Sequence, residues 1–250
     1  MLLVHGLLRE HDRAVLERVD PGSAHPRAVS AGGLVAAVSE APEHGLTDDD
    51  AVTHLDLLVA LVAEVPVLPL PLGTTAPDDD AVREEVLTPA ADQLERQLAA
   101  IADLVEVRLH LTFSTDALTA EVATEDPEIA RLATRARAPG AGFGDRLALG
   151  EAVAGRVADV EAALAEEWTA ELTALADRAV VLTADEQERR TAFCLHRDRL
   201  AAADHAVARL RTAAAGRADV EYVGPLPVYS FLDDLPPGPA EPEQRSRWGW

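Results

Sequence analysis

The sequence predicts an α+β protein of two domains, and three observations support this class. The 250 residues suffice for one large or two medium domains. With 48% hydrophobic and 26% charged residues, the composition is that of a globular protein that buries a core. Segments with the alternation typical of strands are interspersed along the chain with segments of helical spacing, so strands and helices are expected in both halves.

The first half is expected to begin with strands and a helix. The apolar run at residues 2–8 predicts a buried strand, and residues 25–29 and 34–38 predict a second strand or a hairpin turning at Gly32 and Gly33. A helix is predicted from residue 48 to about residue 64. Thr47 suits its N-cap, and the acidic run 48–50 suits the positive end of the helix dipole.

The next segment, residues 65–72, is extended and rich in proline. Its three prolines lack the backbone N–H that a central strand needs, so we predict an edge strand or the entry to a strand. The acidic run 78–80 begins another helix, which reaches about Ile101. Pro89 is expected to kink or break that helix near Thr88.

The second half opens with a strand in which apolar and polar residues alternate. At residues 105–113 the pattern places Glu106, Arg108 and His110 on the face opposite the apolar side chains. The later elements follow from the same reasoning: one or two short helices within 116–136 broken near Pro127, a loop at 139–144, a helix over 145–177, strands at 179–183 and 191–196, a helix over 197–214 and a strand at 220–223. Trp168 lies on the apolar stripe of the long helix, and we expect it to be buried.

From residue 105 the elements follow the order of a ferredoxin-like sandwich, the split β-α-β topology with helices on one face of an antiparallel sheet. The first half is expected to form a related α+β sandwich. The predicted domains are residues 1–102 (N-terminal α+β) and residues 103–234 (C-terminal ferredoxin-like, with the long helix). Residues 235–250 are rich in proline and polar residues, and we predict a disordered tail.

Charge and hydropathy exclude several classes of partner. The 44 acidic residues exceed the 22 basic residues, all of them arginine, and the net charge of −22 repels nucleic acid and anionic membranes. The longest mainly apolar stretch, residues 55–72, contains two acidic residues and three prolines, so no membrane span is expected. The N-terminus lacks the basic region of a signal peptide. We therefore expect an intracellular, soluble protein.

No motif in the sequence indicates catalysis, a cofactor or a metal. The loop at 139–144 lacks the Gly-Lys-Ser/Thr of a phosphate-binding loop, and the acidic runs 48–50 and 78–80 are better explained as helix caps than as cation sites. The eight histidines are scattered; His196 and His205, near Asp198 and Asp204, come nearest to a metal set but do not converge. Cys194 suits a small apolar side chain in a strand. We therefore expect that the protein is not an enzyme.

Two segments resemble a known family. VPVLPLPLG at residues 65–73 resembles the "PVLPLRFGT" element of the gas vesicle protein L/F family, and YVGPLPVYSF at residues 222–231 resembles that family's closing "TGPWPPYSF". The resemblance extends over about residues 1–233. Pro71 and Leu72 stand where the family usually has Arg and Phe.

The resemblance implies an accessory protein of gas vesicle formation that associates with the hydrophobic major shell protein and with other accessory proteins. It implies that the protein is located at the gas vesicle, and in the cytoplasm before assembly. It implies no cofactor. The alternative from the fold alone is a small-molecule-binding regulatory module.

The candidate protein-binding residues are apolar or aromatic and lie in the two motifs: Val67, Leu68, Leu70, Leu72, Tyr229 and Phe231. A proline-interrupted edge presents side chains to a partner without inviting strand addition, so we expect the N-terminal half to carry the contact. Two alternatives stay open. The leucines could fill the core of their own domain, and the closing motif could seal the interface between the domains.

Overall fold

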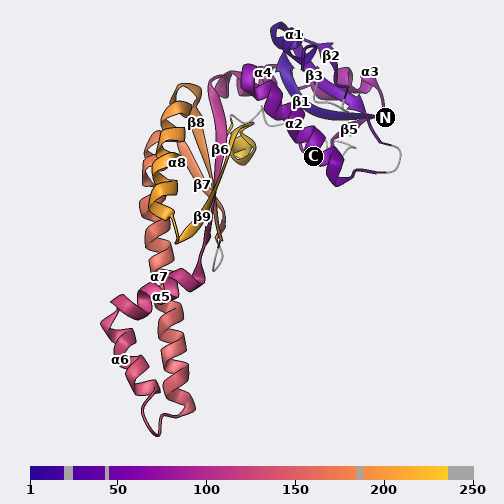
Figure 1. Cartoon of the computed structure of the whole chain (residues 1–250). Coiled ribbons are helices and arrows are strands. Elements are labelled where there is room, and N and C mark those ends of the chain that lie inside the picture. Colours follow the sequence, from indigo (N-terminus) through magenta and orange to yellow (C-terminus); the bar gives the residue numbers. More distant parts are fainter. Residues whose placement is uncertain (20–24, 43–44, 185–187, 236–250) are drawn as a thin grey trace. The chain divides into compact units, whose positions relative to one another are not determined.

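The computed structural model describes residues 1–19, 25–42, 45–184 and 188–235 (Figure 1). The described residues form two compact units. The first unit comprises residues 1–107, 194–197 and 224–235, and the second comprises residues 108–193 and 198–223. The domain boundary between residues 102 and 103 stays a prediction. Leu235, where the predicted tail begins, is buried, and the rest of that tail lies outside the described residues.

The first unit is built on an antiparallel sheet with the strand order β2-β3-β1-β4, and β5 also pairs with β1. The strands are β1 (Leu2–Arg9), β2 (Arg27–Ala31), β3 (Leu34–Glu40), β4 (Leu68–Pro69) and β5 (Thr75–Ala76). The hairpin of β2 and β3 turns at Gly32 and Gly33, which both adopt positive φ. The extended segment 65–72 contributes only the two-residue edge strand β4, because its prolines cannot donate to a ladder.

Helices cover both faces of this sheet. They are η1 (Glu10–Asp12), α1 (Arg13–Leu16), α2 (Asp48–Glu64), α3 (Asp79–Ala81), the π-helical segment η2 (Val82–Leu87), α4 (Ala91–Ala100) and η4 (Tyr229–Asp234). Leu57, Leu58 and Leu61 of α2 pack on one face, and η2 and α4 contact the strands as well. Residues 2–8 of β1 are all buried, as expected for a strand covered on both sides.

The caps of these helices agree with the sequence prediction. Thr47 Oγ1 accepts the Asp50 N–H at 3.3 Å, and the Asp50 carboxylate accepts the Thr47 N–H at 2.8 Å. This reciprocal capping box begins α2. The predicted break near Thr88 and Pro89 is present, since η2 ends at Leu87 and α4 begins at Ala91.

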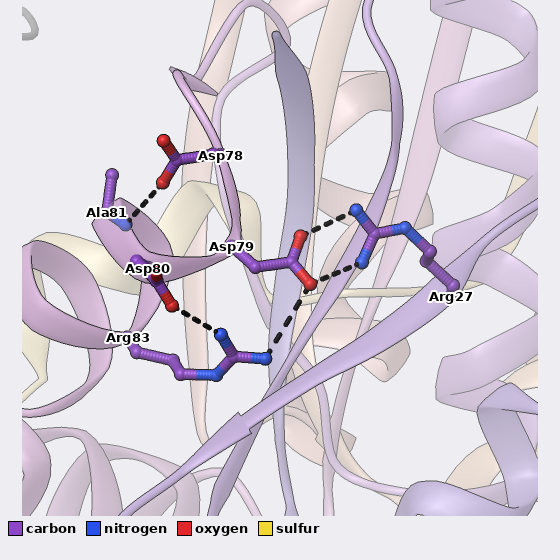
Figure 2. A network of polar contacts seen from close by, with 6 residues as sticks. All are labelled: Arg27, Asp78, Asp79, Asp80, Ala81 and Arg83. Atoms are coloured by element: carbon purple, nitrogen blue, oxygen red, sulfur yellow. Dashed lines mark hydrogen bonds and ion pairs between the residues drawn. The ribbon is translucent and has the colours of Figure 1, made fainter.

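The second acidic run, residues 78–80, is also a cap with ion pairs (Figure 2). Asp78 accepts the Ala81 N–H at 2.9 Å, which caps α3. The Asp79 carboxylate accepts two N–H groups of Arg27, at 2.6 and 3.0 Å, and lies 3.6 Å from Arg83. The Arg27 guanidinium lowers the pKa of Asp79. The acidic run therefore joins the start of α3 to β2.

The second sheet has the strand order β7-β8-β6-β9. Its strands are β6 (Leu104–Phe113), β7 (Arg178–Ala184), β8 (Glu188–His196) and β9 (Ala218–Leu226), and its helices are α5 (Thr115–Glu125), α6 (Pro127–Ala136), α7 (Phe143–Leu175), η3 (Arg197–Arg199) and α8 (Leu200–Ala214). Numbered along the chain, the order is 2-3-1-4, that of a ferredoxin-like sandwich. The predicted α+β class and the antiparallel sheets are confirmed.

In the second unit, α5 and α6 are inserted between β6 and α7 and pack against α7 (Figure 1). The predicted break near Pro127 is present: α5 and α6 are two helices, and Asp126 is the N-cap of α6. The indole of Trp168 in α7 stacks on the ring of Phe113 in β6, with centroids 5.8 Å apart. No helix in the described part of the chain is both long and apolar enough to cross a membrane.

Candidate functional site

The structure buries most of the residues that the sequence singled out for protein binding. Val67, Leu68 and Leu70 are buried in the first unit, and Val67 belongs to the core cluster under α2. Phe231 is buried and Tyr229 is half-buried in η4. Leu72 is 37% exposed. A binding role for these residues stays a prediction, and Leu72 is the member of the set whose side chain a partner can reach most easily.

A chain of polar side chains that the sequence did not reveal runs through the first unit. His5 Nε2 lies 2.8 Å from Ser39 Oγ, and His5 Nδ1 lies 2.9 Å from His54 Nδ1. His54 Nε2 lies 2.9 Å from the hydroxyl of Tyr229, which donates to the Leu70 carbonyl at 3.3 Å. His5, Ser39 and His54 are buried. The polar chain thus joins β1, β3 and α2 to the closing segment, residues 224–235.

A β-bulge brings His5 into this chain. The register of β1 against β3 shifts between Val4 and Gly6, so His5 is the extra residue of the bulge. Gly6 lies where the backbone of β4 comes close, since a Cβ there would be 3.1 Å from the Leu68 carbonyl oxygen. His5, as the bulge residue, therefore directs its imidazole into the polar chain, and Gly6 lets the backbone of β4 approach β1 closely.

All the hydrogen bonds of this polar chain can form when both histidines are neutral. Because the Tyr229 hydroxyl donates to Leu70, its oxygen accepts from Nε2–H of His54, and the Nδ1 of His54 then carries no proton. That Nδ1 accepts from Nδ1–H of His5, and Nε2 of His5 accepts the Ser39 hydroxyl. Burial, with a smaller contribution from His54, lowers the pKa of His5 to about 4, and burial also lowers the pKa of His54.

This depressed pKa predicts that the first unit loses stability in mild acid. The unfolded chain binds a proton at His5 near pH 6.5, whereas the native chain does so only near pH 4. Stability is therefore complete above pH 6.5 and falls as the pH decreases toward 4. The shift corresponds to about 3 kcal/mol in total, of which about 2 kcal/mol is lost by about pH 5.

Chemical denaturation at about pH 7.5 and about pH 5 measures this loss. The drop should shrink in His5→Asn, which removes the titrating ring, and should persist in His205→Gln, because His205 is exposed on α8. An equal pH dependence of wild type and His5→Asn would contradict the assignment.

A second buried polar contact holds the closing segment. The Glu106 side chain in β6 is fully buried, and its carboxylate accepts the Ser230 N–H at 2.8 Å and the Ser230 hydroxyl at 2.9 Å. The sequence placed Glu106 on the polar face of the strand, opposite the apolar side chains. The structure buries it there because the closing segment covers this face at Glu106, where Ser230 contacts the carboxylate.

The glycine of the closing motif is required by the same packing. Gly224 has φ of 156°, and a Cβ at this position would lie 2.7 Å from Val107 Cγ1 and 3.1 Å from the Glu106 carbonyl oxygen. A side chain would therefore push the closing segment away from β6. Within the motif that the sequence singled out, residues 222–231, the Gly224 backbone thus packs closely on β6, and the side chains of Tyr229 and Ser230 make polar contacts with His54 and Glu106.

These polar groups are satisfied and buried, so the geometry is that of a structural site. Within residues 1–19, 25–42, 45–184 and 188–235, no group of three or more His, Cys, Asp or Glu side chains could hold a metal ion. Cys194 is buried in β8. In the second unit, a groove of about 470 Å³ between α5 and α7 is lined mainly by small and apolar residues, with Thr115, Thr119 and Glu161 as its polar members.

The first unit also carries exposed apolar side chains near Gly73 and on α2. Leu46, which precedes the cap of α2, lies against Gly73, the neighbour of Leu72. Val52 and Leu55 are exposed one helical turn apart on α2. We call these four residues (Leu46, Val52, Leu55 and Leu72) the Leu72 group.

Comparisons with known proteins agree over nearly the whole chain. Residues 2–233 match the family model described as gas vesicle synthesis protein GvpL/GvpF. The chain is 30% identical over 246 residues to gas vesicle protein F of Streptomyces sp. (strain CB03234). This alignment covers 92% of this chain and 98% of the relative.

Two solved structures share the fold. The crystal structure of GvpF from Anabaena sp. PCC7120 is similar with a TM-score of 0.75 at 16% identity, covering 92% of this chain and 97% of the other. GvpF from Microcystis aeruginosa is similar with a TM-score of 0.68 at 14% identity, covering 92% and 98%.

Proposed function

The chain belongs to the GvpL/GvpF family of gas vesicle synthesis proteins, and from this premise we propose that it binds the hydrophobic major shell protein and holds it ready for assembly. The observation that carries the proposal is the family match, which extends from residue 2 to residue 233 and so includes both units. An accessory role in gas vesicle formation follows from membership of the family. The identity of the bound protein is the proposed step.

The Leu72 group supports a contact with an apolar partner. Its side chains are large, uncharged and exposed on the first unit. The surrounding chain carries a net charge of −22, which keeps a complex with an apolar subunit in solution through repulsion between complexes. An acidic body with a localised apolar contact therefore suits a protein that carries an aggregation-prone subunit.

Leu72→Asp tests this contact in the full chain. A charge introduced into an apolar contact should weaken capture of the major shell protein at least about tenfold, the effect of about 1.4 kcal/mol of binding free energy. Leu147→Asp is the matched control, because Leu147 is also an exposed leucine but lies on α7 in the second unit.

Co-purification of tagged full-length variants with the shell protein gives the answer. Capture that is equal for wild type and Leu72→Asp, or that is lost only in Leu147→Asp, would contradict the proposed surface. Division of the chain at residues 102 and 103 would be a poorer test. It removes Tyr229 from His54 and separates Glu106 and Ser230 from the rest of the first unit.

We place the protein at the gas vesicle, and in the cytoplasm before assembly, with other accessory proteins as further partners. In this proposal the protein binds the major shell protein and delivers it for assembly, without a catalytic step. The buried histidines and Glu106 stabilise the first unit, which presents the Leu72 group.

A further inference from the structure

The turn between α6 and α7 is basic in an otherwise acidic chain. Residues 129–150 contain four arginines and one acid, Asp145, whereas the whole chain has twice as many acidic as basic residues. All four arginines are exposed: Arg131, Arg135, Arg137 and Arg146. A positive surface of this kind attracts anionic groups within about a Debye length, although the chain as a whole repels them.

Contacts between α6 and α7 keep these arginines together. The two helices pack side by side (Figure 1). Arg135 lies 3.4 Å from the carboxylate of Asp145, which also accepts the Gly142 N–H at 3.1 Å at the start of α7. Arg137 is the C-cap of α6, and Arg146 lies in the first turn of α7. The positive charge is therefore concentrated at one end of the helix pair.

Large apolar side chains are exposed beside these arginines. Phe143, the first residue of α7, is 75% exposed and is the most exposed large apolar residue in the described part of the chain. Leu147 follows one turn later and is 47% exposed. Because residues three or four apart adjoin on a helix, Arg146 lies next to Phe143. Exposed aromatic side chains and arginines are the residues that protein interfaces favour.

The apolar side of α7 continues from the turn into the groove between α5 and α7. Gly150 lies three residues after Leu147, and Ala154 lies four residues after Gly150. Together with Phe143, these positions form one stripe of the helix. Gly150, Ala154 and Val157 line the groove of about 470 Å³. The stripe from Phe143 to Val157 is about 20 Å long, the length of four turns of a helix.

We propose that the α6–α7 turn and this groove bind an acidic amphipathic helix of a partner protein other than the major shell protein. The apolar side of that helix packs on Phe143, Leu147 and the groove, and its acids face the arginines. A helix suits this surface because it satisfies its own backbone hydrogen bonds and presents only side chains. Glu161 lines the groove 18 positions after Phe143, at the end away from the turn, so the acids of the partner belong at the turn.

Charge distinguishes this partner from a second copy and from a membrane. A second copy also carries −22, and an anionic bilayer is large enough to meet acidic parts of the chain as well as the turn. The net repulsion of the chain acts against both. A single acidic helix contacts only the turn and the groove. The observation that favours it is the confinement of positive charge to one end of an apolar surface that is one helix long.

Fluorescence anisotropy of a labelled helical peptide of about 16 residues tests the proposal. One face of the peptide carries leucine and alanine and the other glutamate, and the matched peptide has glutamine in place of glutamate. The full chain should bind the glutamate peptide between about 1 and 100 µM, at least about fivefold more tightly than the glutamine peptide. Salt should weaken binding of the glutamate peptide. The net charge of the chain alone predicts the opposite preference and the opposite salt effect.

Substitutions locate the bound peptide. Arg137→Ala combined with Arg146→Ala should weaken the glutamate peptide at least about fivefold and leave the glutamine peptide unchanged. Arg209→Ala combined with Arg211→Ala is the matched control, because it removes the same charge from exposed positions on α8 of the same unit. Phe143→Ala should weaken both peptides at least about fivefold, since it removes the apolar anchor.

Binding of neither peptide at about 100 µM, or equal affinity for both, would overturn the proposal. So would a control variant that loses as much affinity as the variant at the turn. Two measurements address the other occupants. Vesicles that contain phosphatidylserine should not bind the chain, and sedimentation velocity should give 26.6 kDa. Vesicle binding or a dimer that Phe143→Ala abolishes would assign the surface to a membrane or a second copy instead. These assays contain no shell protein, so their outcome is independent of the proposed function.

Discussion

Replacing Trp168 by alanine should lower the free energy of unfolding of the second unit by about 3–5 kcal/mol. The indole is 8% exposed and stacks on Phe113, with an angle of 17° between the ring planes. The substitution removes the largest side chain on the buried stripe of α7 and leaves a cavity against β6. A stacked aromatic pair also contributes beyond the area it buries.

Chemical denaturation followed by circular dichroism measures this loss. Phe143→Ala is the matched control, because Phe143 is an aromatic residue of the same helix that is 75% exposed. The control should change the free energy of unfolding by less than about 0.5 kcal/mol. Equal denaturation midpoints for wild type and Trp168→Ala would contradict the packing of α7 on β6.

Glu106→Ala should lower the free energy of unfolding of the first unit by a similar amount, about 3–5 kcal/mol. It removes the acceptor for both the N–H and the hydroxyl of Ser230 and leaves a cavity where a fully buried side chain was. Buried donors without an acceptor lose their hydration and gain nothing in return. The loss should also release the closing segment, which joins the first unit through Ser230 and Tyr229.

Two variants separate this effect from a general loss of charge. Glu106→Gln keeps the shape and one acceptor oxygen, so it should cost about half as much as alanine. Glu221→Ala removes an exposed acid that contacts His110 on the second sheet, and it should cost less than about 0.5 kcal/mol. If Glu106→Ala were as mild as Glu221→Ala, the closing segment would not be held as described.

Local patterns in the sequence predicted the elements well, because each depends on neighbours in the chain. Thr47 with Asp50, the break before Pro89 and the helices on either side of Pro127 all follow from capping and from the missing N–H of proline. The ferredoxin-like order of the second half followed from the sequence of elements alone, since few topologies accommodate it.

The buried polar contacts could not be predicted in this way, because their partners are far apart in sequence. His5 and His54 are separated by 49 residues, and Glu106 and Ser230 by 124. Alternation in β6 correctly placed Leu109 and Leu111 in the core, but it takes no account of a distant segment that covers the opposite face at Glu106. The one available signal was the HG dipeptide within an otherwise apolar strand, which is where the bulge lies.

The burial of the candidate binding residues was undecided for a similar reason. Successive side chains of a strand point to opposite faces, but Val65–Leu72 forms only two residues of strand, so alternation could not sort its leucines. The structure places Val67, Leu68 and Leu70 inside and leaves Leu72 accessible. This distinction turns a motif of nine residues into one position at which a substitution tests binding without removing the core.

The most direct test of the account is whether the full chain keeps the major shell protein from aggregating. The shell protein is diluted from denaturant into buffer with the chain in slight molar excess, and the pellet and supernatant are compared after centrifugation. The account predicts that the shell protein stays in the supernatant in complex with the wild-type chain, and that Leu72→Asp retains less of it than Leu147→Asp does. If the shell protein pellets as fully with this chain as with an unrelated protein of equal acidity, the proposed function is wrong.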